Sequence, residues 1–101
     1  MQGRTHNCGQ LRLANVGEEV KLVGWYENLR KVSKNLGFLI LRDFYGTTQI
    51  VVETEEIMEQ LSSINYESTI EIIGTVRERS SKNATLPTGE IEVVPSKLTV
   101  L

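Results

Sequence analysis

Apolar and polar residues alternate most clearly between Leu36 and Val52, where two apolar runs flank the turn Arg42-Asp-Phe-Tyr-Gly46. Two such runs around a turn that contains glycine predict a β-hairpin. Side chains alternate between the two faces of a strand. One face of this hairpin is purely aliphatic, with Leu39, Leu41, Ile50 and Val52. We therefore expect that face to line the core.

The opposite face of the hairpin carries Phe38, Arg42 and Gln49. A tight turn around Tyr45-Gly46 is expected to set Arg42 across from Gln49. A ring, a guanidinium and an amide exposed together are suited to stack on an unpaired base, meet a phosphate and read a base edge. The alternative is a strand buried on both faces, with Phe38 in the core.

The chain before the hairpin predicts one more strand. Residues 1–17 are polar with a weak apolar pattern, which indicates a loop with a short helical turn or strand. Glu18–Glu27 alternates as a strand, and Gly24 marks a bulge or bend. Asn28–Asn35 is basic and is interpreted as a connecting loop.

A short helix and two strands are expected after the hairpin. Thr54 suits a helix N-cap, and Ile57, Leu61 and Ile64 form one apolar stripe that would cover an open end of the sheet. The remaining chain begins with a strand over Ser68–Arg79 that is interrupted at Gly74, followed by a polar loop over Ser80–Gly89. A strand over Glu90–Val94 comes next, with Ile91 and Val93 pointing inward, and Pro95 ends it. A further edge strand is expected over Lys97–Leu101.

Three strands, a helix and two strands predict an all-β fold: a five-stranded OB-fold Greek-key barrel with one short helix between strands 3 and 4. Residues 1–101 are expected to form this single domain. An SH3-like barrel is the alternative, but it normally lacks such a helix. OB-folds bind oligonucleotides on strands 2 and 3, bordered by the loops after strands 1 and 4. Arg30, Phe38, Gln49 and the segment Arg77–Asn83 map to that surface, which favours the exposed interpretation of Phe38.

Charge is separated along the chain. The net charge is −2, which argues against binding to bulk polyanions. Six acids and no base lie between Glu53 and Glu71, whereas the bases gather as Arg30, Lys31 and Lys34, and as Arg77, Arg79 and Lys82. This separation fits a modest nucleic-acid footprint with an acidic back, and it also fits ordinary solvated faces.

Composition excludes several other classes of function. Arg42 and Asp43 interrupt the longest apolar run, so no membrane span is expected, and no signal peptide is recognisable. The single cysteine fits a reducing compartment. One His and one Cys cannot build a zinc site. His6 and Cys8 are expected to lie in a flexible terminal segment without an orienting third group, and no phosphate-binding glycine loop is present. We expect no catalytic centre, and Asp43 is expected to accept hydrogen bonds within its turn.

The motifs together resemble the N-terminal anticodon-binding domain of aspartyl-tRNA synthetase of the bacterial and mitochondrial type. They are Arg4-Thr-His-Asn-Cys-Gly9, Gly24-Trp25, Phe38-Leu-Ile-Leu-Arg-Asp-Phe-Tyr-Gly46 with Gln49, Gly74-Thr-Val-Arg77 and Thr88-Gly-Glu-Ile-Glu-Val93. The resemblance covers nearly the whole chain. Each motif is weak alone, and five in the right order and spacing are specific.

The resemblance assigns roles to seven residues. It implies that Phe38 stacks on the middle anticodon base, that Gln49 reads the edge of that base and that Glu90 contacts the anticodon. It further implies that Arg30, Arg77, Arg79 and Asn83 contact the RNA backbone and bases. The chain departs from the family's usual run of arginines after Gly-Trp, which leaves open whether Arg30 or Lys31 faces the RNA.

The resemblance implies recognition of the aspartate tRNA anticodon, while ATP and Mg²⁺ would serve a separate catalytic domain of a dimeric parent enzyme. No cofactor is expected in this domain, and the domain is expected to be monomeric when it is isolated from its dimeric parent. The compartment would be the bacterial cytoplasm or the mitochondrial matrix. Alternatives are the related asparaginyl or lysyl domain, a sequence-tolerant single-strand binder, or a protein-interaction barrel that uses Phe38 and Ile40.

Overall fold

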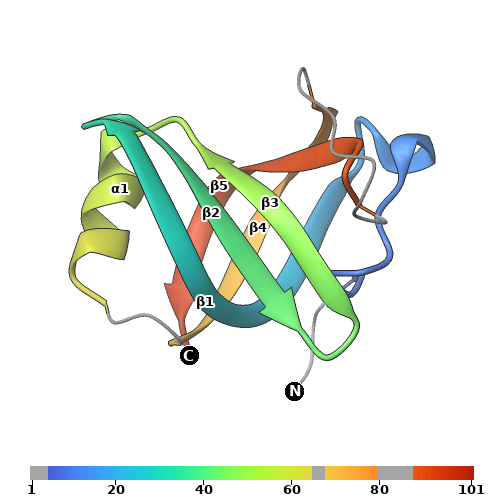
Figure 1. The fold of residues 1–101 in the computed structure, drawn as a ribbon, viewed down its shortest axis with the longest axis horizontal. Helices are drawn as coiled ribbons and strands as arrows, with labels where there is room; N and C mark the ends of the chain where they lie inside the picture. The colour runs from blue at the N-terminus through green and yellow to red at the C-terminus, as the bar shows by residue number, and fades with distance from the viewer. Residues whose placement is uncertain (1–4, 65–67, 80–87) are drawn as a thin grey trace.

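The computed structural model describes residues 5–64, 68–79 and 88–101. Within these residues, five strands form a closed barrel in the order β1-β2-β3-β5-β4, and the short α-helix α1 lies beside it (Figure 1). The elements are η1 (Leu13–Asn15), β1 (Glu19–Ser33), β2 (Leu36–Asp43), β3 (Gly46–Val52), α1 (Glu55–Ser62), β4 (Thr69–Glu78) and β5 (Ile91–Val100). This arrangement confirms the expected OB-fold, with its helix between β3 and β4.

Strand β1 is longer than predicted. It pairs with β4 over Glu19–Trp25 and with β2 over Trp25–Ser33, so one strand serves both neighbours. The interpretation of Asn28–Asn35 as a loop is therefore wrong for most of its length. The segment is polar because most of its side chains are exposed, although Leu29 packs against the core. Gly24 lies where β1 passes between its two partners, and a Cβ there would come within 2.4 Å of the Arg42 carbonyl oxygen.

The β2–β3 hairpin confirms the predicted division of faces. Its aliphatic side chains Leu39, Leu41, Ile50 and Val52 are fully buried in the core. The predicted register is wrong: Arg42 pairs with Thr47, and Gln49 pairs with Ile40. The turn causes this difference, because the Asp43 carboxylate accepts hydrogen bonds from the amides of Tyr45 (2.8 Å) and Gly46 (3.1 Å) and so closes a two-residue turn.

Helix α1 covers one end of the barrel, as predicted. The Thr54 hydroxyl accepts a hydrogen bond from the Ile57 amide and caps the helix. Ile57, Met58 and Leu61 are buried in the core, and Ile64 packs against it from beyond the end of the helix. Among the described residues, no helix is long and apolar enough to cross a membrane.

Strands β4 and β5 complete the barrel, and β5 is longer than expected. The prediction that Pro95 ends the last strand is wrong, because β5 continues to Val100. Pro95 lies opposite Gly74 at a register shift between β4 and β5. A bulge tolerates a residue that lacks an amide hydrogen. Gly74 is required there because a Cβ would come within 2.4 Å of the Val94 carbonyl oxygen.

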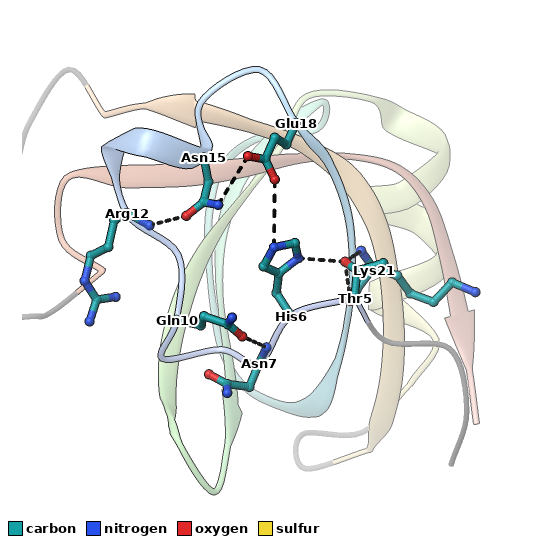
Figure 2. Close-up of polar contacts among 8 residues, drawn as sticks. All are labelled: Thr5, His6, Asn7, Gln10, Arg12, Asn15, Glu18 and Lys21. Carbon is teal, nitrogen blue, oxygen red and sulfur yellow. Dashed lines mark hydrogen bonds and ion pairs between the residues drawn. The ribbon is translucent and has the colours of Figure 1, made fainter.

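The segment Thr5–Leu11 is packed against the barrel. Cys8 and Leu11 are fully buried, and the Cys8 amide donates to the Asp43 carboxylate (2.8 Å). The expectation of a flexible terminal segment is therefore wrong for these residues. Figure 2 shows the polar side chains that hold the segment: His6 lies between the Thr5 hydroxyl (2.8 Å) and the Glu18 carboxylate (3.8 Å).

Candidate nucleic-acid interface

The outward face of β1, β2 and β3 presents its side chains in three rows, which follow from the strand register. One row contains Arg30, Phe38 and Val51. The next contains Asn28, Ile40 and Gln49, and the third contains Trp25, Arg42 and Thr47. Phe38 and Gln49 therefore share one face and occupy neighbouring rows. The core lies behind this face.

Phe38 is half-buried at the surface and does not belong to the core cluster. Arg30 lies directly opposite it in β1, and the guanidinium carbon of Arg30 is 5.1 Å from the centroid of the Phe38 ring. This is cation–π geometry. Lys31 instead pairs with Gly37, so Arg30 rather than Lys31 belongs to the row that contains Phe38. The expected outward position of Phe38 is confirmed.

Gln49 belongs to a polar network that joins three strands. Its side-chain nitrogen Nε2 donates to Oε1 of Glu92 in β5, at 3.3 Å. The other oxygen of Glu92 accepts from Arg77 in β4, at 2.8 Å from Nε and 2.6 Å from Nη2. Arg77 also contacts Glu53, with 3.2 Å between Nη1 and Oε2. Only 7% of Glu92 is exposed, which leaves its carboxylate enclosed by these partners.

The electrostatics of this network follow from its two carboxylates. The hydrogen bond to Glu92 is the main factor that raises the pKa of Arg77, while burial lowers it and Glu53 adds a smaller increase. The Arg77 charge is thus largely compensated within the protein. Arg42 is compensated similarly, since its hydrogen-bonded ion pair with Glu27 raises its pKa. Cations that are already paired offer less attraction to phosphate than their number suggests.

Two other predicted site residues flank the network. Arg79 follows β4, and its amide donates to the Glu90 carbonyl oxygen at 2.9 Å. Glu90 is exposed just before β5. Among the described residues, the Arg79 side-chain Nε is buried without a hydrogen bond. Asn83, the remaining predicted site residue, lies outside the described residues.

Sequence reasoning missed Glu92, which the structure brings to Gln49 and Arg77. The pattern contained the necessary signal. Ile91 and Val93 were expected to point inward, and alternation then places Glu92 on the same outer surface as Gln49. Glu90, the acid that the resemblance singles out, is exposed two residues earlier in the chain, and its contact with RNA stays a prediction.

A second missed feature is aromatic. At the β2–β3 turn, 92% of Phe44 and 63% of Tyr45 are exposed. The Phe44 ring contacts Trp25 edge-on, with 5.4 Å between centroids and 71° between planes. The Asp43 hydrogen bonds that close the turn hold these rings outward.

The interface combines the groups needed to recognise an unpaired nucleotide. Phe38 provides a stacking surface, Arg30 provides a cation beside it, and the Gln49 amide provides hydrogen-bonding atoms. Within the described residues, no cluster of three or more His, Cys, Asp or Glu side chains is arranged to hold a metal ion.

Comparison with known proteins agrees with this geometry. Residues 20–101 match the model of the OB-fold nucleic acid binding domain family. The chain is 46% identical over 101 residues to the aspartate–tRNA ligase of Bacteroides fragilis, and the match covers 97% of this chain and 17% of the relative. It is also 46% identical to the aspartate–tRNA(Asp/Asn) ligase of Rickettsia bellii, and that match covers 96% of this chain and 17% of the relative.

A solved structure shares the architecture. The asparaginyl-tRNA synthetase of Pyrococcus horikoshii in complex with asparaginyl-adenylate superposes with a TM-score of 0.79 at 28% identity, covering 100% of this chain and 23% of that one. The chain thus spans about a sixth of the length of the curated ligases it matches. The matched family model, the barrel and its outward face lead to one conclusion: this chain belongs to the OB-fold nucleic acid binding domain family.

Proposed function

We propose that this chain is the anticodon-binding domain of an aspartate–tRNA ligase and recognises the anticodon loop of aspartate tRNA. One observation carries the proposal: Phe38 lies at the surface between Arg30 on one side and the Gln49–Glu92 pair on the other. Anticodon bases are unpaired and can splay out of the loop, so a ring bordered by a cation and an amide suits them. The 46% identity to aspartate–tRNA ligases supports the choice of tRNA.

The catalytic steps of the ligase are assigned to a separate domain of the parent enzyme. Formation of aspartyl-adenylate needs ATP and Mg²⁺, which the catalytic domain of the parent would bind. This domain takes no cofactor and contributes affinity and specificity. The parent acts as a homodimer in the bacterial cytoplasm or the mitochondrial matrix.

A second candidate is an enzyme that acts on both aspartate and asparagine tRNAs. It is favoured by the Rickettsia bellii relative, whose name includes both tRNAs, and by the asparaginyl-tRNA synthetase structure. The aspartate and asparagine anticodons, GUC and GUU, differ only in their last base. A site centred on Phe38 and Gln49 reads the shared middle uracil, so it would accept both loops.

Fluorescence anisotropy with labelled anticodon stem–loops tests the proposal. The chain should bind the GUC loop more tightly than a loop with an unrelated anticodon and more tightly than poly-pyrimidine DNA. Equal affinity for all three probes would support a sequence-tolerant single-strand binder. No binding to any of them would support a protein-interaction barrel. Equal binding of GUC and GUU loops, with rejection of others, would favour the dual-specificity candidate.

A further inference from the structure

The side-chain amide of Gln49 has a defined orientation because Glu92 lies beside it. Arg77 holds the second carboxylate oxygen of Glu92, and the Glu92 side chain is almost completely buried. An ionised carboxylate can only accept hydrogen bonds, so the nitrogen of Gln49 must face it. The reversed amide would bring the Gln49 oxygen against the Glu92 oxygen, which is repulsive. The 3.3 Å contact therefore fixes which end of the amide is nitrogen.

A fixed amide distinguishes two bases that a rotating amide does not. Against uracil, a glutamine oxygen accepts from N3–H while its nitrogen donates to O4. Against cytosine, the roles reverse: the nitrogen donates to N3 and the oxygen accepts from the N4 amino group. An amide free to flip satisfies either pyrimidine equally, whereas a fixed amide satisfies one and opposes the other.

We propose that Glu92 is a positioning residue that locks the Gln49 amide and thereby makes the site select uracil over cytosine next to Phe38. The inference rests on the proposed function, which supplies uracil as the middle base. Glu92 acts through Gln49. Arg77 acts one step further away, because its contacts hold the Glu92 carboxylate in place.

The chain offers a matched control for this role. Glu53 and Glu92 both contact Arg77, but only Glu92 contacts Gln49. Glu53→Gln and Glu92→Gln remove the same charge from the same network. Each should change RNA affinity in a similar, sequence-independent way through charge. Only Glu92→Gln should change the ratio of affinities for two loops. Arg77 can only donate, so it holds the oxygen of the new amide, which turns the new amide nitrogen toward Gln49 and favours the reversed orientation of the Gln49 amide.

The experiment titrates two stem–loops that differ only in a middle U or C against the wild-type chain and both variants. Wild type should prefer the U loop by tenfold or more, and Glu92→Gln should reduce that ratio by roughly tenfold. Glu53→Gln should keep the wild-type ratio. Glu92→Asp, which keeps the charge but shortens the reach to Gln49, is the second variant and should also lower the ratio.

The outcomes separate this inference from the proposed function. Folding of each variant is checked by circular dichroism, and Glu92→Asp replaces Glu92→Gln if the latter unfolds. An unchanged U-to-C ratio in a folded Glu92 variant overturns the positioning role while tRNA recognition stands. An equal fall in the ratio for Glu53→Gln also overturns it, since charge alone would then explain the effect. Failure of wild type to bind the U loop overturns the proposed function, and this inference with it.

Discussion

Arg30 lies over the ring of Phe38, with its guanidinium carbon 5.1 Å from the ring centroid. The two residues are directly opposite each other in β1 and β2. The contact holds a planar cation against the ring. In the proposed complex with RNA, the pair would bring a stacking surface and a positive charge to the same nucleotide.

Replacing Phe38 with Ala should weaken binding of the GUC loop by about 1–3 kcal/mol, because a stacking surface is lost. Stability should change little, since the ring is at the surface. The adjacent Leu39→Ala is the contrast: Leu39 is fully buried, and the substitution should lower the free energy of unfolding by about 2–5 kcal/mol. Anisotropy titration and urea unfolding measure the two effects. A Phe38→Ala variant that unfolds like Leu39→Ala would show that the ring supports the core.

Replacing Arg30 with Lys should lower RNA affinity several-fold while leaving its salt dependence unchanged. Lysine keeps the charge but lacks the planar group that stacks on Phe38. Lys31→Arg is the matched control, because Lys31 lies opposite Gly37 and should tolerate the exchange. Titrations at several salt concentrations measure both quantities. Wild-type affinity in Arg30→Lys would mean that only the charge matters.

Arg79→Ala should flatten the salt dependence of RNA binding more than Arg77→Ala does. The sequence suggests the same effect for both arginines, but Glu53 and Glu92 already compensate the Arg77 charge. Loss of one phosphate contact lowers the slope of log K against log salt by about one. Titrations from low to moderate salt give the slopes. The reverse order would mean that Arg77 leaves its carboxylates to meet phosphate.

Replacing Gly24 with Ala should lower the free energy of unfolding by about 1–3 kcal/mol, through overpacking. The new Cβ would lie 2.4 Å from the Arg42 carbonyl oxygen, which belongs to the paired strand and cannot move freely. Val32→Ala, at an exposed position of the same strand, should change stability by no more than about 0.5 kcal/mol. Urea unfolding followed by circular dichroism compares them. Equal stability of the two variants would show that the barrel adjusts at this point.

Strand alternation predicted the two faces of the hairpin correctly. Leu39 and Ile50 are paired and both apolar, so the face that carries them must be the buried one. The register was not predictable from alternation, since it depends on how the Asp43 carboxylate closes the turn. A shift of two residues preserves the faces, which is why Phe38 and Gln49 were still assigned to the same one.

The elements that were mispredicted share a physical cause: pairing partners distant in sequence. The polar end of β1 is a strand because β2 pairs with it, and Pro95 is tolerated because Gly74 lies opposite at a bulge. The contact of Glu92 with Gln49 and Arg77 was likewise not foreseen, because it depends on how three strands lie together. The RNA contact that the resemblance implies for Glu90 stays a prediction.

The burial of Cys8 and Leu11 matters for anyone who produces this domain. The family match starts at residue 20, yet the core also needs these two earlier side chains. A protein limited to residues 20–101 would lack these two side chains and so have a cavity in its core. The Asp43 carboxylate would also lose the hydrogen bond that the Cys8 amide donates. Expression boundaries should therefore be drawn upstream of Thr5, even though conventional domain limits suggest that this stretch is dispensable.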